Sequence, residues 1–261
     1  MAEAGRHVRV MLPLVACLAG ALTIRAAETQ YDLTSGGVVG INGAGFATTD
    51  VKSTGTGVLD PFLRLQANGT EQGYNASLPQ SGLMPDAKTG SWTHDIQLGS
   101  VPSGGGYYQF LLDINQSGNN QSALLSLDQL QIYTSSTATS DATAFPPIGA
   151  LRYNLDGAGD SAIIMDASLT SGSGSGDLFA FIPTSAFSGA TSSDYVYLFA
   201  RFGDLNASND GFEEFGLLST GAVEPPIIPQ GSEVPDFGGT LMLMGMGLIG
   251  VESLRRKLRL L

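Results

Sequence analysis

The sequence predicts a mainly β protein, an antiparallel β-sandwich of jelly-roll type. Three observations lead to this fold class. Short runs of alternating apolar and polar residues recur along the chain, clusters of Gly, Ser, Asn and Asp separate them, and no helical periodicity appears before residue 234. The 35 glycines suit the many tight turns that such a fold needs.

Ten segments carry the strand pattern, and Tyr195–Phe202 is the clearest because it is rich in aromatic residues. The expected strands are Gly45–Thr49, Gly57–Gln66, Thr93–Leu98, Tyr107–Asn115, Ser126–Thr134, Gly149–Leu155, Ala162–Leu169, Asp177–Ile182, Tyr195–Phe202 and Phe212–Leu218.

Charge is distributed unevenly along the chain. Between Glu28 and Asp236 there are five basic and 22 acidic residues, a net charge of −17 (5 − 22). Such a surface repels nucleic acid and attracts divalent cations. The single cysteine, Cys17, precedes this body, so no disulfide is expected in it.

Residues 1–26 have the parts of a secretory signal peptide. Arg6 and Arg9 lie near the start, Val10–Ile24 is mostly apolar, and small residues follow. We therefore expect export and removal of this segment. An alternative is a lipoprotein, because the Leu-Val-Ala-Cys sequence that ends at Cys17 fits a lipobox.

The C-terminal segment 234–261 combines a short turn motif, an apolar run and a basic end. Positive residues stay on the cytoplasmic side, so we expect a transmembrane helix over 238–254 with its C-terminus inside. The motif residues are Val234, Pro235, Asp236, Phe237, Gly238, Gly239 and Thr240, and the basic stop comprises Arg255, Arg256, Lys257 and Arg259.

This tail resembles the C-terminal sorting signal of the bacterial PEP-CTERM class, in the variant written VPDSG-CTERM. Phe237 and Gly239 depart from the usual residues of that variant. The resemblance implies sorting by an exosortase, a membrane transpeptidase, from the inner membrane to the cell surface or extracellular matrix. A single-pass membrane protein that is never processed is the alternative.

Five segments of the body resemble a recurring domain of exosortase targets: Gly57–Phe62, Asn68–Asn75, Phe110–Asn115, Gly172–Asp177 and Asn209–Glu214. We expect this ectodomain to span 28–222. The Pro-rich segment 223–233 is expected to be an extended stalk between the ectodomain and the membrane.

The body offers little catalytic chemistry. His94 is its only histidine, no serine lies in a nucleophile elbow, and the adjacent Glu213 and Glu214 should point to opposite faces of a strand. We therefore expect no enzyme. The alternative, a polysaccharide hydrolase or lyase, would need a cleft with convergent acids plus His94 or a tyrosine. An exposed aromatic platform would favour binding instead, and its candidate members are Trp92, Tyr74, Tyr107 and Tyr108.

Calcium is the one cofactor with a pattern in the sequence. Residues 113–118 place oxygen ligands at positions 1, 3 and 5 and glycine at position 6 of a calcium loop, but position 12 is Leu124. Asp128 is a candidate to complete such a site. The expected ligands are therefore Asp113, Asn115, Ser117 and Asp128.

These observations predict an exported surface or extracellular-matrix protein with a structural or adhesive role. Extracellular polysaccharide is its expected ligand and an exosortase-like enzyme its expected processing partner.

Overall fold

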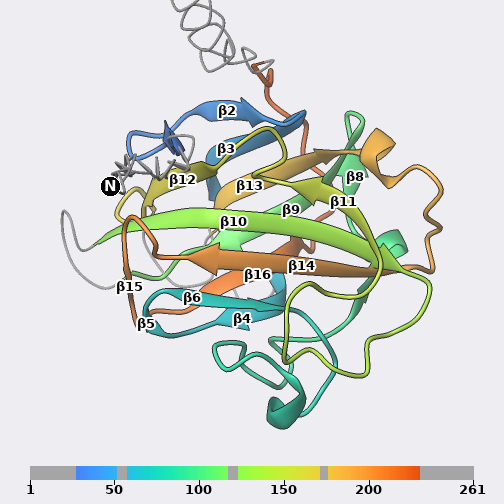
Figure 1. The fold of residues 1–261 in the computed structure, drawn as a ribbon. Coiled ribbons are helices and arrows are strands. Elements are labelled where there is room, and N and C mark those ends of the chain that lie inside the picture. Colours follow the sequence, from blue (N-terminus) through green and yellow to red (C-terminus); the bar gives the residue numbers. More distant parts are fainter. Residues whose placement is uncertain (1–27, 52–57, 117–122, 171–175, 230–261) are drawn as a thin grey trace, which may run out of the picture.

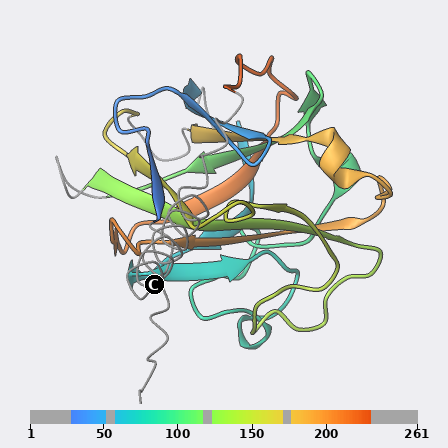
Figure 2. The same cartoon turned by 45° about the horizontal axis from the view of Figure 1, so that its top comes forward.

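The computed structural model describes residues 28–51, 58–116, 123–170 and 176–229. Within these residues the chain is mainly β, and its strands form two stacked sheets, as a β-sandwich does (Figure 1; Figure 2). The described strands pair antiparallel, except that β1 pairs with β12 in parallel.

Sheet A has the strand order β1-β12-β10-β14-β6, with β11 on β10 and β7 on β14. Its strands are β1 (Thr29–Asp32), β6 (Glu71–Tyr74), β7 (Ile96–Gln97), β10 (Leu124–Ser135), β11 (Ala150–Asn154), β12 (Ser161–Asp166) and β14 (Tyr195–Phe202).

Sheet B has the order β2-β3-β13-β9-β16-β4, with β8 on β9, and β15 and β5 form a separate pair. Its strands are β2 (Val38–Ile41), β3 (Ala44–Val51), β4 (Leu59–Leu65), β8 (Ser103–Gly104), β9 (Tyr107–Asp113), β13 (Gly176–Pro183) and β16 (Glu213–Leu218). The separate pair is β5 (Asn68–Gly69) with β15 (Ser208–Asn209), and short 3-10 helices are η1 (Gln80–Gly82), η2 (Leu98–Ser100) and η4 (Thr184–Phe187).

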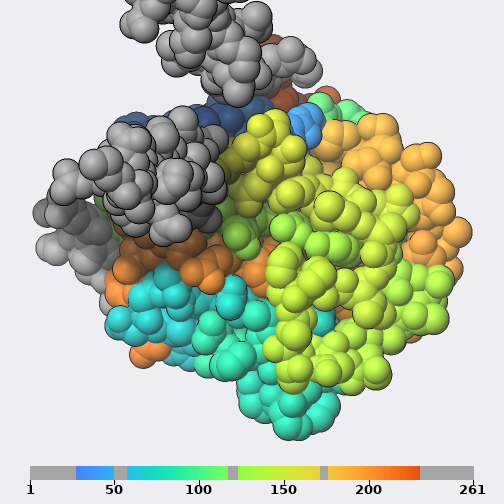
Figure 3. Space-filling model, in the orientation of Figure 1, coloured from blue at the N-terminus to red at the C-terminus, as the bar shows by residue number. Residues whose placement is uncertain are grey.

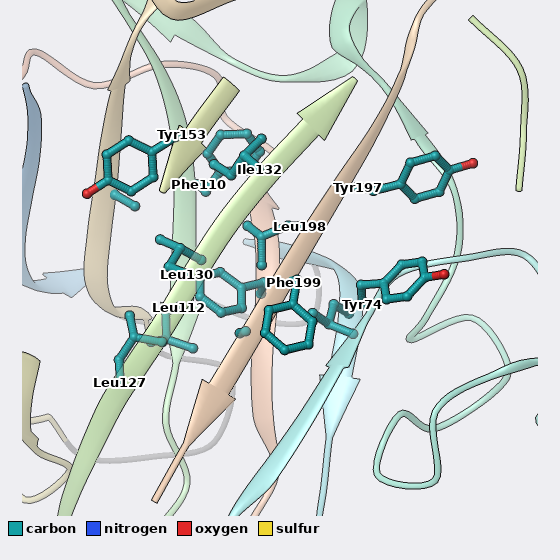
Figure 4. Close-up of a cluster of buried hydrophobic side chains, with 14 of the residues drawn as sticks. Tyr74, Phe110, Leu112, Leu127, Leu130, Ile132, Tyr153, Tyr197, Leu198 and Phe199 are labelled. Atoms are coloured by element: carbon teal, nitrogen blue, oxygen red, sulfur yellow. The ribbon is translucent and has the colours of Figure 1, made fainter. Parts of the chain in front are cut away.

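The main core lies between the two sheets. Phe202 of sheet A packs against Phe215 of sheet B, with ring centroids 6.2 Å apart, and Tyr153 packs against Phe46 at 6.1 Å. Figure 4 shows side chains from β9, β10 and β14 interleaved in this layer. Because neighbouring strand residues point to opposite faces, the alternating apolar residues of these strands supply the core.

The outer face of sheet A is covered by the segment that joins β10 to β11, residues 136–149. Phe145 packs on Phe199 with ring centroids 4.1 Å apart, Thr139 N–H donates to the Tyr197 hydroxyl at 2.7 Å, and the Tyr74 hydroxyl donates to the Asp141 carbonyl at 3.1 Å. In Figure 3 this segment lies on the surface in yellow-green. From Val196 to Ala200, strand β14 is therefore buried on both faces and carries only apolar and aromatic side chains.

The outer face of sheet B carries a second apolar cluster, which includes Leu111, Phe179 and Phe181. Val223 and Ile228 of the predicted stalk pack against this cluster, and the Gln109 amide makes two backbone hydrogen bonds with Val223, of 2.7 and 2.9 Å. Residues 223–229 thus lie along the sandwich.

The structure confirms the mainly β, antiparallel fold class. Tyr195–Phe202 forms β14 with the predicted bounds, whereas Thr93–Leu98 contributes only the two-residue β7. Strands β1, β2 and β6 were missed because they are only four residues long and lack a run of large apolar side chains. Among the residues described, no helix is long and apolar enough to span a membrane. The predicted helix 238–254 lies outside them.

Candidate functional site

A surface groove of about 680 Å³ lies where β4 and β14 begin and β16 ends. Its floor is formed by buried apolar side chains of Ile96, Val101, Leu217 and Leu218. Its polar lining comes from Asp60, His94, Asp95, Gln97, Ser100 and Tyr195. A volume of this size and an apolar floor with a few polar groups are typical of small-ligand and sugar-sized sites.

The strand register places two of the polar side chains together. Gln97 of β7 pairs with Tyr195 of β14, so the two side chains lie on the same face of sheet A. Among the described residues neither side chain makes a hydrogen bond, and neither does Asp60, which is exposed. The groove therefore offers an amide, a phenol and a carboxylate to a ligand.

His94 and Asp95, unlike Gln97 and Tyr195, are held in place by hydrogen bonds. The Nδ1 of His94 lies 3.2 Å from the Ser91 carbonyl, so in the neutral ring Nδ1 carries the proton and Nε2 is the acceptor. The backbone N–H of Asp95 donates to the Ser77 hydroxyl oxygen at 2.9 Å, and Oδ1 of the Asp95 carboxylate is buried. Burial and then the adjacent Asp95 carboxylate raise the pKa of Tyr197.

The four aromatic residues proposed as a platform do not gather on one surface. Tyr74 is buried, Tyr107 packs edge-on against Phe181, and Tyr108 packs against Phe187. Trp92 alone is exposed, at 42 %. The sequence could not predict which of these aromatic residues is exposed, because the local residue pattern is the same whether a surface is covered by another segment or open to water.

Trp92 stacks on an arginine. The guanidinium of Arg64 lies 3.9 Å from the Trp92 ring centroid and 4.6 Å from that of Phe212, between the two rings. Arg64 also forms a salt bridge with Glu214. The neighbouring Glu213 points to the opposite face, as predicted, but both glutamates are buried.

The predicted calcium ligands lie on different parts of the fold. Asp113 ends β9 in sheet B and is buried beside Asp177 of β13. Asp128 lies in β10 of sheet A, where it accepts hydrogen bonds from the Ser126 hydroxyl and from Asp204 N–H. Asn115 is exposed, and Ser117 lies outside the described residues. Asp113 and Asp128 thus belong to different sheets, and the calcium site with these ligands stays a prediction.

Two of these acids have raised pKa values. Burial, and then the charge of Asp113, raises the pKa of Asp177 to about 8, although Ile114 N–H donates to it at 2.7 Å. Burial also raises the pKa of Asp128. Within the described residues, no group of three or more His, Cys, Asp or Glu side chains is arranged to hold a metal ion.

The sequence analysis missed a pair of buried carboxyl groups, those of Glu71 in β6 and Glu213 in β16, each 1 % exposed. Ala67 N–H donates to Glu71 Oε2 at 2.7 Å, and the Gln116 amide donates to Glu213 Oε1. The remaining oxygens, Glu71 Oε1 and Glu213 Oε2, have no hydrogen-bond donor among the described residues. Burial and then the Glu213 carboxyl raise the pKa of Glu71 to about 10.

The sorting motif 234–240, the basic stop 255–259 and the signal peptide 1–26 all lie outside the described residues. Comparisons with family models, with curated proteins and with solved structures find no match to this chain.

Proposed function

We propose that this chain is an exported surface or extracellular-matrix protein whose β-sandwich, of jelly-roll type, binds polysaccharide through the groove beside Tyr195. The observation that carries the binding role is the set of polar groups around an apolar floor, namely the exposed Asp60 and Gln97 and the half-buried Tyr195. Sugars present hydroxyls together with apolar ring faces, so this combination suits them.

The charge of the body narrows the ligand class. With a net charge of −17 over Glu28–Asp236, the protein repels polyanions, so a neutral polysaccharide is the better ligand. Tyr195 offers a ring for stacking, and Gln97 and Asp60 offer hydrogen bonds to hydroxyl groups.

Binding can be measured by affinity electrophoresis of the full chain in gels that contain a neutral glucan, with alginate as the polyanion. We expect the glucan to retard the wild type, and the double variant Gln97→Ala/Tyr195→Ala to bind about tenfold more weakly, from the loss of about 1.4 kcal/mol. The matched control is Gln30→Ala/Tyr31→Ala, which removes the same residue types from β1. Equal retardation of the two double variants would show that the groove is not the binding site.

A second candidate function, a polysaccharide hydrolase or lyase, is supported by His94, Asp60 and Asp95, which line the same groove. Binding is favoured over catalysis because Oδ1 of the Asp95 carboxylate is buried, whereas the carboxylate of Asp60 is exposed. Release of reducing ends or unsaturated products from the glucan, abolished by His94→Ala, would establish the enzyme instead.

Sorting rests on the tail and on its resemblance to the VPDSG-CTERM signal. We propose that an exosortase-like enzyme recognises Pro235, Asp236 and Gly238, just outside the membrane. Replacing the three with alanine should leave export intact and trap the precursor in the inner membrane. Normal surface display of that variant would contradict this step.

A further inference from the structure

Three segments that are far apart in the sequence meet at one end of the sandwich. β5 and β15 pair through Gly69 and Ser208, and Asn209 N–H donates to the Gln116 side-chain oxygen at 3.0 Å. Gln116 in turn donates to Glu213. These contacts join residues 68–75, 110–116 and 208–214 around Glu71 and Glu213.

Glycines allow the close approach of these segments. A Cβ on Gly211 would lie 1.8 Å from the Asn115 carbonyl oxygen, and a Cβ on Gly203 would lie 2.1 Å from that of Gly69. Gly203 also has a φ of +93°, which side chains rarely allow. The backbone segments around Glu71 and Glu213 are thus closely packed against one another.

Two buried carboxyl groups this close together need either a shared proton or a cation between them. Two carboxyl groups face each other away from water, and each has one oxygen without a donor among the described residues. Arg64 is bonded to Glu214, and Arg201 to Asp204 and Gln72, so neither bridges the pair. An unpaired buried charge is strongly unfavourable, whereas a paired or metal-bound one is tolerated.

We propose that Glu71 and Glu213 bind a divalent cation, Ca²⁺, between Glu71 Oε1 and Glu213 Oε2, and that this ion fastens the three segments together. Calcium prefers carboxylate and carbonyl oxygens and accepts irregular geometry, while zinc prefers nitrogen and sulfur ligands and magnesium demands a near-ideal octahedron. The two glutamates would supply part of the six to eight oxygens that calcium takes. The acidity of the body concentrates such a cation at its surface.

This site is independent of the polysaccharide groove and differs from the calcium loop expected from the sequence. It requires neither Asp113 nor Asp128. A single bound proton, shared by the two carboxyl groups, is the competing occupant, and the experiment below separates the two.

The test uses the full chain purified in detergent and stripped with EDTA. Bound calcium is counted by mass spectrometry after dialysis, and melting curves are recorded with and without calcium or magnesium. We expect one calcium ion per chain and an increase in Tm of about 5–10 °C at a hundredfold excess over Kd. Glu71→Gln and Glu213→Gln should each abolish both effects, while Glu224→Gln, an exposed control, should keep them.

Asp113→Asn distinguishes this site from the predicted loop and should leave calcium binding intact. Loss of binding in Asp113→Asn with retention in Glu71→Gln would overturn the proposal. A wild-type chain that binds no calcium at millimolar concentration would also overturn it, whether or not the variants fold, and would assign the pair to a shared proton.

Discussion

The acidic residues near the two ends of strand β16 differ in their exposure to water. At its start, Glu213 is 1 % exposed and lies next to Glu71, while near its end Asp60, which pairs with Leu217, lies exposed at the rim of the groove. Water screens the acid at the groove end, so it is available to a ligand. At the start of β16 water is excluded, so the surrounding protein must compensate the buried carboxyl groups of Glu213 and Glu71.

The same contrast appears in the neighbours of these acids. Near the start of β16 lie two further buried carboxyl groups, those of Asp113 and Asp177, and three chain segments are in contact there. At the groove, apolar side chains lie beneath polar ones, and Asp60 and Gln97 are exposed. We therefore expect substitutions near the start of β16 to change the free energy of unfolding, and substitutions at the groove to change ligand binding.

The largest effect is expected for Gly211→Ala, because its Cβ would lie 1.8 Å from the Asn115 carbonyl oxygen, a backbone atom that cannot move freely. The free energy of unfolding should fall by more than about 3 kcal/mol. The matched change near the groove is Gly99→Ala, whose Cβ would lie 2.9 Å from the Ser192 carbonyl oxygen. Urea unfolding of both variants measures the difference, and equal losses would remove the contrast between the two ends.

A smaller, pH-dependent effect is expected for Asp177→Asn. The pKa of Asp177 is raised from 3.8 to about 8 in the folded state, so its stabilising contribution is complete below pH 3.8 and is lost as the pH rises toward 8. Stability of the wild type should fall over this interval by at most about 1.4 kcal/mol per pH unit. The asparagine variant stays neutral and should show a flatter profile in urea unfolding with EDTA.

The control for Asp177→Asn is Asp60→Asn, which removes an exposed carboxylate from the groove. Its free energy of unfolding at neutral pH should differ from that of the wild type by less than about 0.5 kcal/mol. Parallel pH profiles for the wild type and Asp177→Asn would contradict burial of Asp177 as the source of the effect.

The strand pattern could predict the fold class because alternation is a local property of the chain. Tyr195–Phe202 and Tyr107–Asp113 were recognisable from their own residues. The short strand β6 was not, since Glu71–Tyr74 contains two polar residues and a glycine and becomes a strand only through its pairing with β14. Trp92 and Tyr74 likewise could not be separated, because exposure depends on what covers each residue.

The sequence by itself determined the mainly β class and the acidity of the body, because composition and short-range periodicity carry that information. Only the tertiary structure decided that Glu71 and Glu213, 142 positions apart (213 − 71), share one buried site. It also decided that Gln97 and Tyr195 line one groove. Contacts between distant segments depend on strand order and burial, and these are fixed by packing of the whole chain rather than by any local pattern.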